Sequence, residues 1–509
     1  MRVTRLDLQF RRGVVMTGRI SRLLLFIFVS GAIVSTVSAQ APDTLWTRTY
    51  NCPGYLEGYS IRATSDNGFA IGATGCYPVS GNGGAFLLKL NSSGDTIWTD
   101  GIYPAYGGAF NSIEVTSYGT ILAAGWMHGM FGGVQSEAYA YYGDGDRIWE
   151  MHILAGPSRN GFTWVESTAD DGFVLTDNPN TYQGTYYDIR VSRADSSASI
   201  LWTRIYGGVE EEKTGAARPD IRGGFIVAGS TSSFGMGSFD GYLIRINEDG
   251  DTLWSRTYGG PLSHEFQEIV QAPDSGYVIV GSTSSFGFGA SDIFVVKTNS
   301  LGDTIWTRTF GTELNDYGRS VDRVPSGGYV VAAICGDSTY SEKAYLIRIN
   351  DDGDTLWTKV INPDVTSRAN SVVSLSDSGF IFTGCIIHEY PDYASLWIVR
   401  LGAEVVGIHE SEMPIPGELV LDQNYPNPFN SSTRIGFQVG RETSRISLKV
   451  YDVCGRLVST LHSGQLSRGV FEKTWDGRDI RGHAVSSGVY FCVLENGSAS
   501  VSRRMILMK

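Results

Sequence analysis

Most of the chain after residue 43 consists of short runs in which apolar and polar residues alternate, and each run ends at a cluster of glycine, aspartate or serine. In one unit, Trp254–Tyr258 alternates large and small side chains, and Glu265–Gln271 follows a Gly-Gly break. Two apolar runs, Tyr277–Val280 and Asp292–Lys297, complete the unit. Period-two runs between turn residues, without helical periodicity, predict β-strands joined by hairpins. The unit therefore predicts four strands.

This unit recurs at a nearly constant spacing. A motif of the form Gly-Asp-Thr-Leu/Ile-Trp marks the copies, and its tryptophan returns every 51 to 53 residues, at Trp46, Trp98, Trp149, Trp202, Trp254, Trp306 and Trp357. A turn glycine before an apolar pair keeps the same step, at Gly68, Gly119, Gly172, Gly224, Gly276, Gly328 and Gly379. Self-similarity at a fixed period of this length is the signature of a repeat architecture.

Four-stranded units repeated radially predict a β-propeller, which leaves few exposed sheet edges. The segment Asp43–Tyr50 is an outer strand without a preceding partner, and the last copy stops at Ser395–Leu401 without its outer strand. The N-terminal strand can therefore complete the last blade. The sequence predicts an all-β protein with a seven-bladed β-propeller over residues 43–401.

The copies resemble a bacterial propeller repeat of the general form DGGY–apolar–GST–SFG–G–D–YLIKL–GDTLW–YGG. The fit is closest at 223–260 and 276–311 and loosest in the second and third copies. They are also similar to the tryptophan-marked repeats of quinoprotein dehydrogenases. The resemblance implies a fold and not an activity, because propellers host many unrelated functions.

The first 39 residues have the order of a secretory signal peptide. The apolar run Leu23–Val29 is preceded by positive charge, and the small residues of Val37–Ala39 end the segment; the arginines closest before the run are Arg11, Arg12, Arg19 and Arg22. Charged region, apolar region and cleavage site in this order predict export and a mature chain that begins near Gln40. Met16 is an alternative start, because the positive region from Arg19 onward is sufficient.

A second domain follows the propeller. Residues 402–417 contain Pro414 and Pro416 and little periodicity, which predicts a linker. Alternating runs separated by Gly and Asp turns then predict a small immunoglobulin-like β-sandwich over residues 418–509.

Four motifs in this C-terminal segment resemble the type A sorting domain of type IX secretion. They are NYPNPF, YDxxGR, WDG and SGVY, and their characteristic residues here are Asn424, Tyr425, Pro426, Asn427, Pro428, Phe429, Asp452, Gly455, Arg456, Trp475, Asp476 and Gly477. The resemblance implies Sec export and then passage across the outer membrane, with the type IX machinery as partner. It also implies release of the protein or its attachment to surface lipopolysaccharide. Cys454 and Cys492 depart from the family pattern, and whether they form a disulfide is open.

Composition narrows the functional classes. Acidic residues outnumber basic ones by 53 to 40, for a formal net charge of -13, so nucleic acid is not an expected partner. Six cysteines in 509 residues do not make a disulfide scaffold, and no CxxC pair suggests structural zinc. We expect a monomer without a transmembrane anchor after processing.

The chain offers little recognisable catalytic chemistry. Neither an HExxH motif nor a GxSxG elbow occurs, so we expect no metal, no cofactor and no catalytic triad. The segments Asn247–Asp251 and Asn350–Asp354 superficially suggest calcium loops. They lack the downstream bidentate acid and recur with the repeat, which predicts hairpin turns.

One set of residues forms a candidate ligand site. In a propeller the loop that enters each innermost strand lies at one rim of the central channel. Counting back eleven or twelve residues from the marker glycines gives Glu57, Glu212, Glu265, Asp316 and Arg368. The four acids could hold a cation or an amine-bearing ligand, or they could be ordinary solvated loop residues. Nearby loops carry apolar residues that could contact a glycan or protein, or pack between blades: Trp126, Met130, Phe131, Phe234, Phe286 and Phe288.

Two functional classes remain. The first is a secreted or cell-surface protein that binds a glycan, protein or cell surface through one face of the propeller. The second is a secreted polysaccharide-degrading enzyme, a glycoside hydrolase or lyase on a propeller scaffold. The absence of a paired-carboxylate signature outside the repeat positions favours the binding protein.

Overall fold

The computed structural model describes the chain except for residues 1–37, 53, 77–82, 103–106, 129–133, 180–186, 338–340, 362–363, 389–392, 408–418, 422–423, 425–426, 428, 440–443, 453–455, 468, 497–499 and 508–509. The expected signal peptide, apart from Ser38 and Ala39, lies outside the described residues. The chain divides into a unit over Ser38–Gly407 and a C-terminal unit from Ile408 onward. No helix with the length and apolar character of a membrane span occurs in the described part of the chain.

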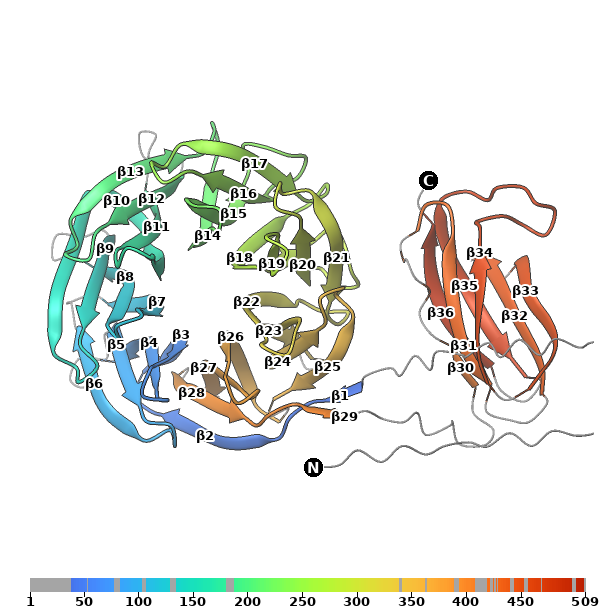
Figure 1. The fold of residues 1–509 in the computed structure, drawn as a ribbon, viewed down its shortest axis with the longest axis horizontal. Helices are drawn as coiled ribbons and strands as arrows, with labels where there is room; N and C mark the ends of the chain where they lie inside the picture. Colours follow the sequence, from blue (N-terminus) through green and yellow to red (C-terminus); the bar gives the residue numbers. More distant parts are fainter. Residues whose placement is uncertain are drawn as a thin grey trace, which may run out of the picture. The chain divides into compact units, whose positions relative to one another are not determined.

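The larger unit is the expected seven-bladed propeller, with its blades arranged radially (Figure 1). The first blade consists of β3 (Glu57–Ala63), β4 (Phe69–Cys76), β5 (Gly83–Leu90) and β6 (Thr96–Ile102). The second consists of β7 (Gly108–Val115), β8 (Ile121–His128), β9 (Val134–Tyr141) and the start of β10 (Arg147–Ser167). The third consists of the end of β10, β11 (Phe173–Pro179), β12 (Ile189–Ala194) and β13 (Ile200–Tyr206). β10 runs from the outer edge of the second blade into the inner edge of the third, so these blades share one seven-stranded sheet.

Blades four to six each form a separate four-stranded sheet. They are β14 (Glu212–Pro219), β15 (Phe225–Thr231), β16 (Asp240–Ile246) and β17 (Thr252–Tyr258); β18 (His264–Gln271), β19 (Tyr277–Thr283), β20 (Asp292–Thr298) and β21 (Thr304–Phe310); and β22 (Tyr317–Arg323), β23 (Tyr329–Gly336), β24 (Glu342–Ile349) and β25 (Thr355–Val360).

The seventh blade closes the ring with the N-terminal strand. β26 (Thr366–Ser374), β27 (Phe380–His388) and β28 (Tyr393–Leu401) are completed by β2 (Thr44–Tyr50), which pairs antiparallel with β28 from Thr44 opposite Leu401 to Tyr50 opposite Leu396. The predicted ring closure is therefore confirmed. Beyond it, β1 (Ser38–Gln40) pairs with β29 (Val405–Gly407), so the described propeller unit continues past Leu401.

The hydrophobic core of the propeller lies between the blades. Seven clusters of buried side chains each join two neighbouring blades, and one of them joins the first to the last through Ile61 and Leu396. Burial of apolar surface thus depends on neighbours around the whole ring, as is typical of repeat architectures.

The repeated tryptophan lies on the outer strand of each blade and in most blades contacts the turn before the outer strand of the next blade. Trp202 Nε1 donates a 2.8 Å hydrogen bond to the carbonyl of Glu248, in the turn before the next outer strand. Gly250 in that turn has φ +84°, and a Cβ there would lie 3.1 Å from the Trp202 ring. Asn247 Oδ1 accepts from the N–H groups of Asp249 and Asp251, so the segment is a hairpin turn as predicted.

A buried cation on the third strand of most blades pairs with an acid in a turn. The pairs within single blades are Lys89–Asp66, Arg193–Asp170, Arg245–Asp220, Lys297–Asp274 and Arg400–Asp377. In the sixth blade the turn carries Ser326 instead, and Arg348 pairs at 2.9 Å with Glu404, which lies just after β28. The segment following the last blade therefore supplies an acid that the sixth blade lacks.

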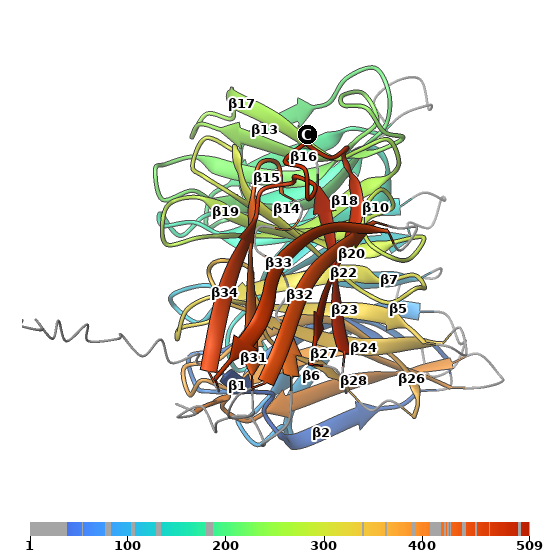
Figure 2. The same ribbon diagram turned by 90° about the vertical axis from the view of Figure 1, so that its right-hand side faces the viewer.

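The C-terminal unit is the predicted sandwich of two sheets. One contains β30 (Leu419–Leu421), β31 (Thr433–Val439) and β34 (Gly469–Trp475), and the other β33 (Leu457–Leu466), β32 (Ser444–Asp452), β35 (Gly488–Glu495) and β36 (Ser500–Leu507). Figure 2 shows β32 and β33 side by side. Cys492 is a free thiol buried in the core, so it does not form the disulfide with Cys454 that the sequence left open. In the propeller unit, Cys52 is disulfide-bonded.

Candidate functional site

The central channel is shaped by a β-bulge in each innermost strand. The register shifts bracket residues that follow one another by 51 or 52 positions, namely Tyr59, Asn111, Thr163, Gly215, Gln267, Arg319 and Asn370. We call them the bulge ring. A bulge re-aims side chains locally, and all seven residues line one cavity of about 650 Å³. This volume is within the range of small-molecule sites.

The residues that directly follow the bulge ring in the chain connect adjacent blades through hydrogen bonds. The residue after each bulge accepts from a backbone N–H of the next blade in five cases, with distances of 3.1–3.3 Å: Ser60 from Ile113, Ser112 from Val165, Glu268 from Val321, Ser320 from Val372 and Ser371 from Ile61. The last of these bonds spans the junction of the seventh and first blades. Trp164 and Ala216 occupy the two remaining positions.

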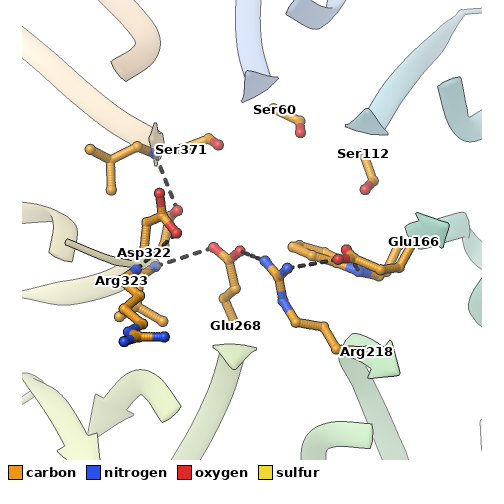
Figure 3. A network of polar contacts seen from close by, with 12 residues as sticks. Ser60, Ser112, Glu166, Arg218, Glu268, Asp322, Arg323 and Ser371 are labelled. Atoms are coloured by element: carbon orange, nitrogen blue, oxygen red, sulfur yellow. Dashed lines mark hydrogen bonds and ion pairs between the residues drawn. The ribbon is translucent and has the colours of Figure 1, made fainter. Parts of the chain in front are cut away.

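Charged side chains from three neighbouring innermost strands form an ion-pair network. Figure 3 shows Arg218 between Glu166 and Glu268, and each ion pair measures 2.8 Å. The Trp164 ring has the guanidinium groups of Arg218 and Arg62 at 5.1 and 5.4 Å from its centroid. Burial raises the pKa of Glu166 to about 7, although Arg218 opposes the shift.

The five predicted rim residues do not form one acidic cluster. Glu57, Glu212, Glu265 and Arg368 line the cavity, whereas Asp316 does not. Asp316 is fully buried and accepts from the backbone N–H groups of Thr312 (2.7 Å) and Gly336 (3.1 Å), so it organises loops. Burial raises its pKa.

The other four predicted residues also have partners. Glu57 accepts from the Asn370 amide at 2.8 Å and lies 3.7 Å from Arg368, which also pairs with Glu342. Glu265 pairs with Lys213. Glu212 is fully buried and accepts from the Thr231 hydroxyl at 2.7 Å. A ligand-binding role for the five residues stays a prediction, and no group of three potential metal ligands occurs among the described residues.

Arg319 is a channel residue that the sequence reasoning missed. It stands at the bulge position of the sixth blade and lines the cavity. The signal was present in the chain, because stacking the repeats at 52 residues aligns Arg319 with Gln267. The bulge that directs both side chains inward is not visible in the sequence pattern.

Exposed apolar side chains gather at the edge of the sheets where the innermost strands begin. The loops that enter the inner strands and the loops between second and third strands meet there, because Glu212 pairs with Thr231 and Thr231 with Asp240. We call this the upper face. Its exposed residues in blades four and five include Val209, Phe234, Met236, Leu262, Phe286 and Phe288. Met130 and Phe131, expected in the same face, lie outside the described residues.

The motif residues of the C-terminal unit form its core and turns. Phe429 and Trp475 are buried against each other with centroids 5.5 Å apart. Asp452 pairs with Arg456 at 2.7 Å, and Gly477 has φ +66°. The Asn424 amide donates to Thr433, Asn427 accepts from the Ile506 N–H, and Asp476 accepts from the Arg478 N–H. Tyr425, Pro426, Pro428 and Gly455 lie outside the described residues.

The fold and the channel define a β-propeller protein with a C-terminal immunoglobulin-like domain. Residues 423–500 match the family described as the FlgD Ig-like domain. Sixty residues, 12% of this chain, are 35% identical to the basal-body rod modification protein FlgD of Salmonella typhimurium and cover 26% of it. The chain thus spans about a quarter of the length of the curated relatives it matches.

Two solved structures are similar to this chain at low sequence identity. PorZ, described as an essential bacterial surface component of the type-IX secretion system of Porphyromonas gingivalis, is 14% identical with a TM-score of 0.30; the match covers 91% of this chain and 70% of PorZ. YCF48, solved bound to D1 peptide, is 11% identical with a TM-score of 0.43; the match covers 73% of this chain and 99% of YCF48.

Proposed function

We propose that the chain is exported by its signal peptide, carried across the outer membrane by type IX secretion, and then acts outside the cell as a binding protein. The delivery part rests on two features. The segment before Gln40 has the order of a signal peptide, and residues 418–509 carry sorting-type motifs on an immunoglobulin-like fold. The motif residues stabilise that fold, which would present a shaped surface to the secretion machinery.

Fractionation of the native host tests the delivery role. A truncated protein should end at Gly407, because Glu404 and β29 belong to the propeller unit. We expect this form to cross the inner membrane and accumulate in the periplasm as a folded, protease-resistant propeller. The full-length protein should reach the cell surface or the medium. Equal amounts of both forms outside the cell would refute a sorting role for the C-terminal unit.

The binding role rests on the central cavity. About 650 Å³ of space is lined by amide, hydroxyl, charged and aromatic side chains. The upper face adds apolar side chains of high exposure, such as Met236 at 83% and Phe288 at 65%. Polar groups in a concave site beside exposed apolar residues suit a glycan or a surface protein as ligand. Binding of the purified mature protein to a glycan array and to fixed cells tests this role, and the absence of any binding would refute it.

One observation favours the enzymatic alternative. Glu166 belongs to the ion-pair network with Arg218 (Figure 3), and burial raises its pKa to about 7, which is the range of a general acid in glycoside hydrolysis. Incubation with a polysaccharide panel, followed by measurement of new reducing ends, separates the two functions. Release of reducing ends that disappears in Glu166→Gln would establish the enzyme.

A further inference from the structure

Arg319 differs from the other cations that line the channel. Arg368 pairs with Glu57 and Glu342, and Lys213 pairs with Glu265. Among the described residues Arg319 forms no ion pair, and its Nε is buried without a hydrogen-bond partner. Its guanidinium lies 5.8 Å from the centroid of the Tyr317 ring.

A partly buried cation without a counterion is unfavourable. Burial lowers the pKa of the Arg319 guanidinium, and the positive charge of Arg368 adds to that shift, while the negative charges of Glu57 and Glu342 oppose it. Removal of water from an unpaired charge costs free energy, which an anionic group in the cavity would offset. The other two cations of the lining each pair with a carboxylate, whereas Arg319 has none within ion-pair distance among the described residues, so an anionic group beside it would supply the missing partner.

The rest of the bulge ring is neutral and rich in hydrogen-bonding groups. Gln267 brings an amide, Thr163 a hydroxyl and Tyr59 a phenol, and Trp126 adds an aromatic ring to the lining. Amides bond sugar hydroxyls as both donor and acceptor, and aromatic rings cover the apolar face of a sugar. The anion should be singly charged, because Glu57 and Glu342 stand near enough to influence Arg319 and would repel a dianion more strongly.

We propose that the channel binds a carboxylate-bearing saccharide, a uronate, with its carboxylate paired to Arg319 and its hydroxyls bonded to the bulge ring. A guanidinium can hold a carboxylate through two parallel hydrogen bonds, which gives orientation as well as affinity. This inference rests on the proposed binding function and specifies its ligand class.

Calorimetric titration of the purified mature protein tests the inference. The probes are short oligomers of galacturonate, glucuronate and mannuronate, with neutral oligomers of galactose, glucose and mannose as references. We expect at least one uronate to bind, and Arg319→Gln to weaken it about tenfold to a hundredfold. Higher salt should weaken the uronate complex as well. The fold should tolerate this change, because Gln267 occupies the same position in the preceding blade.

Arg256→Gln is the matched control. Arg256 lies on the outer strand β17 with 45% of its side chain exposed, so the variant removes the same charge away from the channel. Its uronate affinity should equal that of the wild type. Unchanged uronate binding in Arg319→Gln, or neutral oligomers that bind as tightly as uronates, would overturn the inference and leave the binding function intact. The absence of binding to any glycan or cell surface would overturn both.

Discussion

Replacement of Glu404 by alanine should destabilise the propeller strongly, although Glu404 lies outside the seven repeats. Both side chains of the Glu404–Arg348 pair are 2% exposed. The carboxylate accepts from Arg348 Nε (3.0 Å) and Nη2 (2.9 Å), from Trp357 Nε1 (3.2 Å) and from Ser326 Oγ (3.0 Å). The substitution removes four bonds and leaves a buried guanidinium without its counterion.

The expected loss is about 3 kcal/mol of unfolding free energy, within the 3–5 kcal/mol typical of a broken buried pair. We expect the lower end of this range of free energies because the Arg348 guanidinium keeps its hydrogen bonds to the carbonyls of Ile349 (2.7 Å) and Gly327 (2.6 Å). Asp377→Ala is the matched control, since Asp377 plays the same part in the seventh blade but is 64% exposed. Water can replace that carboxylate, so this variant should lose about 1 kcal/mol.

Urea unfolding followed by tryptophan fluorescence measures both losses, because ten of the eleven tryptophans belong to the propeller. The Arg348 guanidinium helps to hold the pKa of Glu404 below its ordinary value of 4.5, so the stabilisation is present at neutral pH and lost as pH falls through the folded-state pKa. The difference between wild type and Glu404→Ala should therefore shrink below about pH 4.5. Equal losses for the two variants, or a loss under about 0.5 kcal/mol for Glu404→Ala, would refute the reasoning.

Three further outcomes are expected. Deletion of 43–50 should destabilise the whole propeller, because it removes the partner of β28 and the packing of the half-buried Trp46 and Tyr50, together worth about 1.5–3 kcal/mol; a melting temperature within a degree or two of the full-length protein would contradict this. N-terminal sequencing of the secreted protein should give Gln40 or a close neighbour, and a start beyond Leu45 would contradict both the cleavage site and the closing strand. Glu166 has its pKa raised from 4.5 to about 7, so the folded state retains a proton there that the unfolded state loses, and its contribution to stability should decline between those pH values. Glu166→Gln should remove that decline in pH-dependent urea unfolding, and a persistent slope would assign it to another group.

The sequence predicted the blades and the ring closure because their determinants repeat. Tryptophan and glycine recur at one spacing, and the structure shows them in contact across neighbouring blades. Glu404 could not be found in this way, because it follows the last repeat and reaches a blade 56 residues earlier in the chain. The rim acids were placed near the channel by counting, but counting does not reveal the backbone amides that hold Asp316 or the Lys213 that pairs with Glu265.

Arg319 shows the same limit for the candidate site. The repeat gives the position of Arg319 in the chain. The direction of its side chain follows from a β-bulge, which depends on the pairing of β22 with β23. Whether a charged group has a partner is a property of the surrounding blades, so it becomes visible only when they are in place. Local patterns therefore predicted the elements, and tertiary contacts determined which side chains remain available for a ligand.

The pairing of β2 with β28 brings the two ends of the mature propeller together, with Thr44 opposite Leu401 and the Gly402 N–H donating to the carbonyl of Asp43. Segments that precede and follow such a unit are therefore attached at neighbouring points, and neither has to pass around the ring. A short peptide could join the old ends, and new ends could be opened at an outer hairpin such as Asn247–Asp251, so a circularly permuted propeller should retain the same blades. The fold of the ring would then not depend on which blade contains the ends of the chain.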